Sequence, residues 1–274
     1  MRETAITRKP DKKEQSVLIT GASKGIGAGL ALAFARAGYG QIGVNYHNDK
    51  AGAEAVAAAV IQENAEAEII QADVSLRNEN ERMMEQFLKR FGRIDVLVNN
   101  AGGALAIPEG GFSEMPLDYW DSQIALNLNA AAYACHRAIA HMKENNIQGR
   151  IINISSIHAS ITWVKRKMLP YTAGKAGLEM FTKALAVEVA RYGININAVA
   201  PGFILTKATT RYTEREMAAF IRKIPLGRLG TPDDVAPLVL FLADDTVSRF
   251  IVGQTFTVDG GQSIDGVLDE TIPH

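Results

Sequence analysis

A tyrosine and a lysine lie four residues apart in the segment Tyr171-Thr-Ala-Gly-Lys175. In an α-helix, this spacing places the two side chains on the same face. A phenol is a poor base at its normal pKa of about 10. A neighbouring ammonium group favours the phenolate and lowers that pKa. The pair therefore predicts that Tyr171 works as an acid/base group and that Lys175 assists it.

Two serines end the segment Arg150-Ile-Ile-Asn-Ile-Ser-Ser156, whose apolar residues predict a strand. The carboxyl ends of parallel strands line the ligand crevice in a doubly wound fold, and a hydroxyl there can hold a substrate oxygen as negative charge develops. We expect Ser156 to have this role, with Ser155 replacing it if the register is shifted. Asn127 interrupts an apolar helical run, a pattern more often found for a buried, hydrogen-bonded asparagine than for a catalytic one.

Three glycines occur in Thr20-Gly-Ala-Ser-Lys-Gly-Ile-Gly27, between an expected strand and an expected helix. Gly21 allows a tight turn, Gly25 lets the backbone approach a pyrophosphate, and Gly27 permits close packing of the helix on the strand. The N–H groups at the start of the helix would face the phosphates. A dinucleotide is therefore expected here, with Ser23, Lys24 and Ile26 beside it. The backbone of Asn99-Asn-Ala-Gly102, after another strand, can run beside the same cofactor.

The end of the second expected strand bears on the choice of nicotinamide cofactor. It reads Asn45-Tyr46-His47-Asn48, and the first acid is Asp49. An NAD enzyme usually has an acid at this place, which binds the ribose hydroxyls and would repel a 2′-phosphate. Because that acid is missing and Lys24 lies in the glycine turn, we expect NADP(H), with Asp49 leaving NAD(H) as the alternative. No metal site is expected.

Short β-rich apolar runs alternate with helical patterns along the whole chain. We expect strands at 17–20, 42–46, 68–72, 94–98, 150–154, 194–199 and 255–258. We expect helices at 26–37, 51–62, 79–91, about 117–145, 171–192, 213–221 and 233–242. This alternation predicts an α/β fold, a Rossmann doubly wound parallel sheet with helices on both faces. We expect residues 1–14 to be a flexible arm and residues 15–274 to be a single NAD(P)-binding catalytic domain.

The bulk composition bears on partners and location. The 274 residues include 29 basic and 30 acidic side chains, so nothing indicates a nucleic-acid surface. No apolar run reaches the length of about 20 residues that a membrane span needs, and the N-terminal segment lacks the apolar stretch of a signal peptide. The single cysteine, Cys135, fits a reducing compartment. We expect a cytoplasmic protein with a small-molecule substrate and no nucleic-acid or membrane partner.

Taken together, the motifs resemble those of the short-chain dehydrogenase/reductase family over about residues 15–262. They are Thr-Gly-x-x-x-Gly-x-Gly, Asn-Asn-Ala-Gly, Ser…Tyr-x-x-x-Lys and Pro201-Gly202, in this order. The resemblance implies the family's tetrad at Asn127, Ser156, Tyr171 and Lys175. In it, Tyr171 donates or accepts the proton and Ser156 orients the substrate oxygen. Lys175 binds the nicotinamide ribose and lowers the pKa of the tyrosine, and Asn127 holds a helix kink and a water in a proton relay.

The same resemblance implies further cofactor contacts and an assembly. Asp73 and Val74 match the pair that contacts the adenine. Asn100, Ala101 and Gly102 match the loop beside the cofactor. The segment around the carboxamide matches Pro201, Gly202, Ile204 and Thr206. The region 255–261 resembles the one used for tetramer contacts in the classical subfamily, so a homotetramer is expected.

Several substrates remain open. Ser156-Ile-His158 followed by Trp163 resembles bacterial glucose dehydrogenases of the family, so a sugar, a polyol or a similar small oxygenated substrate is the leading expectation. A 3-oxoacyl-thioester reductase is the alternative, because Pro201-Gly-Phe-Ile204 and Arg228-Leu-Gly230 also resemble those enzymes. Intact Tyr171 and Lys175 argue against a non-enzymatic dinucleotide sensor. The run Lys165-Arg166-Lys167, in a longer segment than is typical of the family, would either attract an anionic substrate or be solvated.

Overall fold

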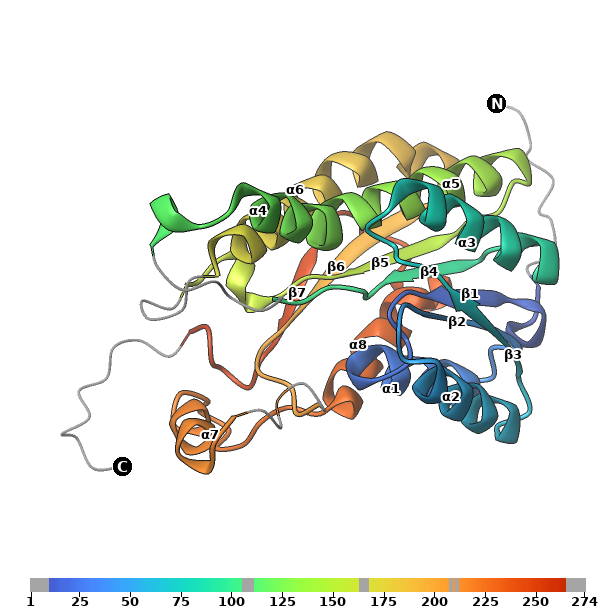
Figure 1. The fold of residues 1–274 in the computed structure, drawn as a ribbon. Coiled ribbons are helices and arrows are strands. Elements are labelled where there is room, and N and C mark those ends of the chain that lie inside the picture. Colours follow the sequence, from blue (N-terminus) through green and yellow to red (C-terminus); the bar gives the residue numbers. More distant parts are fainter. Residues whose placement is uncertain (1–9, 105–110, 163–167, 207–208, 210–211, 265–274) are drawn as a thin grey trace.

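The computed structural model describes residues 10–104, 111–162, 168–206, 209 and 212–264. Within these residues, parallel strands form one sheet in the order β3-β2-β1-β4-β5-β6-β7 (Figure 1). The strands are β1 (Ser16–Ile19), β2 (Gln41–Tyr46), β3 (Glu66–Gln71), β4 (Val96–Asn99), β5 (Arg150–Ile154), β6 (Asn195–Pro201) and β7 (Thr255–Val258). All the expected strands are present, with ends that differ by a few residues.

Helices cover both faces of this sheet (Figure 1). One face carries α1 (Gly25–Arg36), α2 (Lys50–Gln62) and α8 (Pro232–Ala243). The other carries α3 (Arg77–Phe91), α4 (Leu117–Ile124), α5 (Ala130–Glu144) and α6 (Leu169–Val189). The helix α7 (Glu214–Ile221) lies outside these layers (Figure 1), and the short helix α9 (Asp245–Ser248) contacts α8. The predicted single-sheet, doubly wound α/β fold is therefore confirmed.

The alternating side chains of the strands build two cores. In β1, Val17 and Ile19 pack into the core that α1 and α8 cover, whereas Leu18 packs into the core beneath α3 and α5. All three side chains are fully buried. A strand that is buried on both faces has a continuous apolar run, which is why these strands are visible in the sequence.

The strand order reverses beside β1. The chain runs from β1 outward to β2 and β3, then returns to β4 on the other side of β1. Ligands bind outside the carboxyl ends of the strands at such a switch point. The glycine turn after β1, the loop after β4 and the serines after β5 therefore all lie at this edge.

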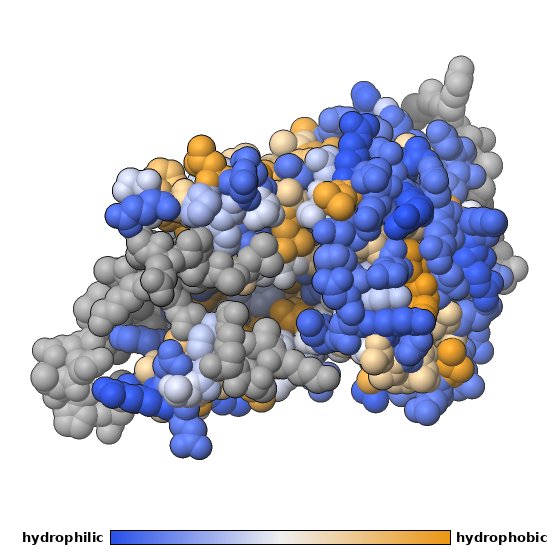
Figure 2. All heavy atoms as spheres, in the orientation of Figure 1, coloured by the Kyte–Doolittle hydropathy of each residue, from blue (hydrophilic) through white to orange (hydrophobic). Residues whose placement is uncertain are grey.

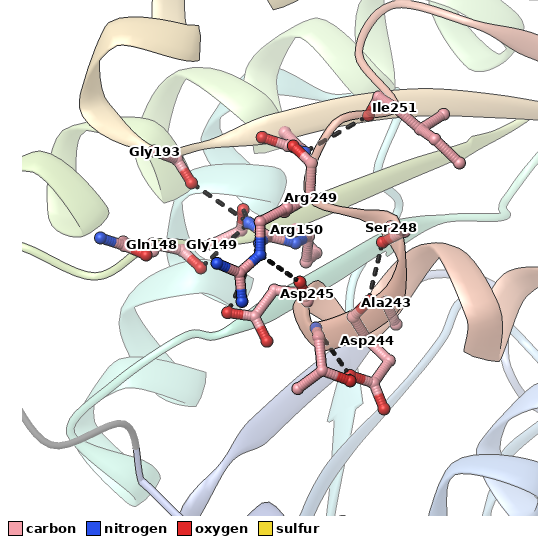
Figure 3. A network of polar contacts seen from close by, with 12 residues as sticks. Gln148, Gly149, Arg150, Gly193, Ala243, Asp244, Asp245, Ser248, Arg249 and Ile251 are labelled. Carbon is pink, nitrogen blue, oxygen red and sulfur yellow. Dashed lines mark hydrogen bonds and ion pairs between the residues drawn. The ribbon is translucent and has the colours of Figure 1, made fainter.

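At the opposite edge, a buried arginine fixes the start of β5. The Arg150 side chain is 4% exposed, and its Nη1 donates to the carbonyl oxygens of Gln148, Gly149 and Gly193 at 3.2, 2.7 and 3.1 Å (Figure 3). Its Nη2 lies 3.7 Å from the Asp245 carboxylate at the start of α9. Burial lowers the pKa of Arg150 to about 10. These contacts are remote from the carboxyl edge and stabilise the fold.

The helices expected over about 117–145 are α4 and α5, which are joined by a π-helical segment, Ala125–Asn129. One expectation for the elements needs correction. Part of the expected flexible arm, Lys12–Glu14, is a 3-10 turn. The Lys12 carbonyl accepts a hydrogen bond from the Gly40 N–H at 3.0 Å. The Nζ of Lys12 lies 3.0 Å from the Asp244 carboxylate. Residues 12–14 thus belong to the domain, whereas residues 1–9 lie outside the described part. Among the described helices, none is long and apolar enough to cross a membrane.

Candidate active site

Tyr171 and Lys175 lie one turn apart near the start of α6. Lys175 is only 3% exposed, and its Nζ donates a hydrogen bond to the carbonyl oxygen of Ile154 at 2.7 Å. Burial lowers the pKa of Lys175 from its ordinary 10.5 to about 8, because a cation loses solvation there. The ammonium is therefore fixed against the end of β5, 6.0 Å from the centroid of the Tyr171 ring.

The two serines after β5 have different partners. The Ser156 side chain is hydrogen-bonded to that of Tyr171, and its Oγ also accepts the His158 N–H at 3.2 Å. Ser155 instead donates its hydroxyl to the Glu179 carboxylate at 2.9 Å. Ser156, and not Ser155, therefore lies against the phenol.

The pKa of Tyr171 differs from the value expected from the sequence. From the sequence, we expect Lys175 to lower the pKa of the Tyr171 phenol. In the structure, burial raises the pKa of Tyr171, and the hydrogen bond with Ser156 offsets only part of this change. Desolvation of the phenolate dominates because the ring is enclosed. The protein alone thus holds Tyr171 as a protonated phenol, the form that donates a proton.

Asn127 is buried in the π-helical segment. Its Oδ1 accepts the Gly103 N–H at 2.9 Å, and its Nδ2 donates to the carbonyls of Gly103 and Gln123 at 3.1 and 3.0 Å. A Cβ placed on Gly102 would lie 3.0 Å from both Asn127 Oδ1 and Lys175 Nζ. Asn127 therefore holds the loop after β4 beside Lys175. The expected helix irregularity is present as a π-turn, and the water-relay role remains a prediction.

The glycine turn fits a dinucleotide phosphate. Gly21 and Gly25 have φ angles of +63° and +60°, in the left-handed region that favours glycine. A Cβ on Gly27 would lie 2.5 Å from Asn100 Nδ2, so only glycine allows this approach. Lys24 is the N-cap of α1; in the described chain its side chain makes no capping bond, and the first turn has no acid. The N–H groups at the start of α1 can therefore bind an anion.

Two buried polar side chains brace this turn. Asn45, 1% exposed, accepts the Gly21 N–H at 2.9 Å and donates to the carbonyls of Ile70 and Ala72 at 3.2 and 3.3 Å. The Thr20 hydroxyl oxygen accepts the N–H groups of Asn100 and Ala101, each at 3.0 Å. Asn45, expected to contact the cofactor, is thus buried and hydrogen-bonds the backbone of the glycine turn to the ends of the neighbouring strands. Thr20 has a bracing role that the sequence motif alone does not reveal.

The residues expected near the adenine and its ribose, at the ends of β2 and β3, differ in exposure. Tyr46 and Val74 are buried, whereas His47 is exposed and its Nε2 lies 3.8 Å from the Asp73 carboxylate. The other Asp73 oxygen accepts the Ser75 hydroxyl at 2.7 Å. In the glycine turn, the carbonyl oxygen of Ser23 lies against Gly52 of α2. A Cβ on Gly52 would lie only 2.6 Å from this oxygen, so the turn and α2 are in close contact.

A cavity of about 240 Å³ lies over Ser156 and Tyr171. Of the predicted cofactor residues, its walls include Ile26, Pro201, Gly202, Ile204 and Thr206. Figure 2 shows the surface hollowed between the side that carries α4 and α6 and the side that carries α7. The cavity thus connects the start of α1 with the hydroxyl groups of the site. Together with the anion-binding turn, this connection fits a nicotinamide dinucleotide.

Four further residues that line the cavity were not among the site residues expected from the sequence. They are His158, Met168, Phe203 and Tyr212. The His158 ring meets that of Tyr171 edge-to-face with 6.3 Å between centroids, and the Phe203 ring stacks on Phe220 of α7 at 4.4 Å. Sequence proximity to Ser156 and to Pro201-Gly202 was the available signal for His158 and Phe203. Within the described ranges, no group of histidine, cysteine or acidic side chains could hold a metal ion.

Comparisons with known proteins agree with this geometry. A family model described as enoyl-(acyl carrier protein) reductase matches residues 21–263. The chain is 40% identical to a 3-oxoacyl-[acyl-carrier-protein] reductase of Synechocystis sp. over 90% of this chain and 96% of that one. It is 38% identical to 3beta-hydroxysteroid dehydrogenase 1 of Eggerthella lenta (93% and 95%) and 34% identical to glucose 1-dehydrogenase 2 of Bacillus subtilis (93% and 96%).

A solved structure of acetoin dehydrogenase from Enterobacter cloacae superposes with a TM-score of 0.83 and 34% identity over 94% of this chain and 98% of that one. The chain belongs to the short-chain dehydrogenase/reductase family. It is an oxidoreductase of CH–OH and C=O groups that uses a nicotinamide cofactor.

Proposed function

We propose that the chain interconverts a carbonyl and a secondary alcohol on a small oxygenated substrate, such as a sugar or a polyol, with NADP(H) as the preferred cofactor. The placement of the Ser156 and Tyr171 side chains in the wall of one cavity, where the serine lowers the pKa of the phenol, carries this proposal. A non-enzymatic sensor of dinucleotides would not need a protonated phenol, a bonded serine and a buried ammonium at the end of such a cavity.

Each residue has a distinct role in the proposed mechanism. When bound, the nicotinamide supplies or accepts the hydride. Ser156 donates a hydrogen bond to the substrate oxygen, on which negative charge develops during reduction. Tyr171 gives its proton to that oxygen, and takes it back when the alcohol is oxidised. Lys175 stabilises the phenolate that remains and offers its ammonium to the nicotinamide ribose.

The surroundings of the glycine turn support NADP(H). Lys24 is exposed at the start of α1, where a cation can attract a 2′-phosphate. The first acid after β2, Asp49, uses its carboxylate as the N-cap of its own helix, α2, which leaves less of it available to bind a ribose hydroxyl.

The cavity volume supports a small substrate. Pockets for drug-sized ligands usually range from roughly 300 to 1,000 Å³, and this cavity has about 240 Å³, which the substrate would share with the nicotinamide. A second candidate is a 3-oxoacyl-thioester reductase, which the 40% identity to a 3-oxoacyl-[acyl-carrier-protein] reductase favours. In that case only the β-keto end of the acyl group would enter the cavity.

A substrate panel tests these proposals. The purified protein is mixed with NADP(H) or NAD(H) and with sugars, polyols, small hydroxyketones or 3-oxoacyl thioesters, and the nicotinamide absorbance is followed. Turnover of sugars or polyols supports the first candidate, and turnover confined to thioesters supports the second. Tight NADPH binding without turnover of any compound would contradict both and would favour the sensor.

We also propose a homotetramer. On α6, Met180 and Val187 have exposed fractions of 63% and 81%, and Phe250, shortly before β7, is fully exposed. Leu178 is buried and Phe181 packs against the core, so these two do not belong to the exposed surface. Association would remove the exposed apolar side chains from water. The cytoplasmic location stays a prediction, in keeping with the buried free thiol of Cys135.

A further inference from the structure

The end of β5 is joined to α6 by a series of contacts between side chains and backbone. Residues 154–156, at the end of β5, contact three residues of α6. These three lie four positions apart along the helix, at 171, 175 and 179. Because residues spaced by four share a helix face, one stripe of α6 meets one stretch of extended chain. The contacts are Ile154 O with Lys175 Nζ at 2.7 Å, Ser155 Oγ with Glu179 Oε1 at 2.9 Å, and Ser156 with Tyr171.

Of these residues, Glu179 has no place in the proposed mechanism. Its carboxylate is half-buried, one turn after Lys175 and one turn before Lys183. Burial raises the pKa of Glu179, while the hydrogen bond from Ser155 and the charges of Lys183 and Lys175 oppose that rise. The hydrogen bond and the two ammonium groups thus favour the ionised form of Glu179 against the effect of its burial.

Lys175 needs such a partner because its burial disfavours the charged form. Glu179 is the group whose charge raises the pKa of Lys175 against the effect of desolvation. Among the described side chains, Tyr171 on α6 and Asn127 on the π-helical segment also lie near Lys175, and both are neutral at physiological pH. His158, in the turn after β5, faces the Tyr171 ring.

We propose that Glu179 is a positioning residue of the active site, which holds the end of β5 against α6 through Ser155 and keeps Lys175 protonated. This inference rests on the proposed roles of Tyr171 and Lys175. A neutral Lys175 neither stabilises the phenolate nor offers an ammonium to the ribose. Glu179 thus sets the alkaline limit of both turnover and NADPH binding.

The test uses Glu179→Gln, which removes the charge and keeps the shape of the side chain. kcat/KM for an active substrate of the panel and the Kd for NADPH, from fluorescence titration, are measured at pH values from about 6 to 10. We expect the alkaline loss of both quantities to move to lower pH by roughly half to one unit, the size expected for a partly solvated charge nearby. Glu188→Gln, an exposed acid on the same helix, is the matched control and should coincide with the wild type.

Two further outcomes separate the electrostatic role from a structural one. A profile of Glu179→Gln that coincides with those of the wild type and Glu188→Gln overturns the inference. An equal loss at every pH, together with a lower Tm, also overturns it, because the residue would then support only the fold. Ser155→Ala removes the hydrogen bond and keeps the charge, so it should shift the alkaline limb less than Glu179→Gln does.

The double variant Ser155→Ala/Glu179→Gln tests whether the two side chains act together. If they do, its loss of kcat/KM is smaller than the product of the two single losses. Losses that multiply contradict the shared role. Tyr171→Phe separates this inference from the proposed function. An active Tyr171→Phe variant refutes the proposed function whatever Glu179 does. An inactive one, with an unchanged Glu179→Gln profile, refutes only the present inference.

Discussion

The carboxylate of Asp49 accepts a hydrogen bond from the backbone N–H of Gly52 at 3.0 Å. Asp49 is the first acid after β2, where an NAD enzyme usually places the carboxylate that binds the ribose hydroxyls. The capping bond holds this carboxylate at the start of α2. In the proposed NADP(H) complex, the exposed Lys24 would attract the 2′-phosphate.

We expect the wild type to bind NADPH more tightly than NADH. Lys24→Ala should weaken NADPH binding by roughly fivefold at most and leave NADH binding almost unchanged, since one exposed charge pair contributes up to about 1 kcal/mol. Fluorescence titration of both cofactors measures this difference. Lys89→Ala, at an exposed lysine in the last turn of α3, is the control and should have no effect. Equal or stronger binding of NADH to the wild type would show that another residue sets the preference.

Tyr171→Phe should remove almost all turnover and leave cofactor binding nearly intact. The substitution deletes the phenol oxygen that exchanges the proton and keeps the ring beside His158. General acid–base groups typically contribute about 10²- to 10⁴-fold to the rate. Steady-state rates and NADPH titration measure the two effects, and Tyr192→Phe on the surface is the control. A Tyr171→Phe variant that keeps more than about a tenth of the rate, with chemistry rate-limiting, contradicts the assignment.

The burial of Lys175 should appear as a pH-dependent stability. Its pKa is about 8 in the folded protein, against an ordinary 10.5. Between these values the unfolded chain binds more protons, so the free energy of unfolding rises with pH across this window. Lys175→Met removes this dependence. Relative to the variant, the wild type should gain up to about 3 kcal/mol from pH 8 to pH 10.5.

Urea unfolding at several pH values measures this gain. Lys183→Met is the control, because Lys183 lies on the same helix and its side chain is exposed. Its stability should follow that of the wild type at each pH. If all three proteins show parallel pH dependence, Lys175 is not deprotonated more readily in the folded state.

The exposed apolar residues of α6 should be buried by association. We expect sedimentation to show a tetramer at micromolar concentration. Met180→Glu should dissociate it into smaller species, because a carboxylate would then be buried without a partner. Ile61→Glu, at an exposed apolar position of α2, should leave the assembly intact. A stable wild-type monomer at micromolar concentration rules out the tetramer.

The fold was predictable because its central strands are buried on both faces. Segments such as β1 and β5 are short apolar runs, and the helices between them have clear periodicity. The helix irregularity at Asn127 was expected only from the family resemblance, because one extra residue in a turn leaves the apolar pattern of 117–145 almost continuous. The helix α9 is also absent from the sequence expectations, since four residues are too few to show a period.

The candidate site was predictable where its residues are close in sequence. Tyr171 and Lys175 share one helix, and Ser156 ends the strand before it. The bracing role of Asn45 depends on β2 lying beside β1, which no local pattern encodes. The partnership of Ser155 with Glu179 and the stacking of Phe203 on Phe220 also arise from tertiary packing.

The last prediction concerns the charge of the substrate. Lys165, Arg166 and Lys167 lie outside the described residues, but Met168, the next residue of the chain, lines the cavity. Three adjacent cations near the cavity would raise the local concentration of an anionic substrate, such as a carboxylated or phosphorylated sugar or an acyl carrier. The alternative is that the run is solvated or contacts a neighbouring subunit.

Replacing all three residues by glutamine should lower kcat/KM for an anionic substrate and weaken its dependence on ionic strength. Salt screens such attraction over about 10 Å at 0.1 M, so the wild-type rate should fall as salt is added. A neutral analogue of the substrate should show neither effect. The matched control neutralises three exposed cations of α3, Arg77, Arg82 and Lys89, and should behave as the wild type. If the wild type shows no salt dependence and the triple variant loses nothing, the basic run has no role in substrate capture and the substrate is neutral.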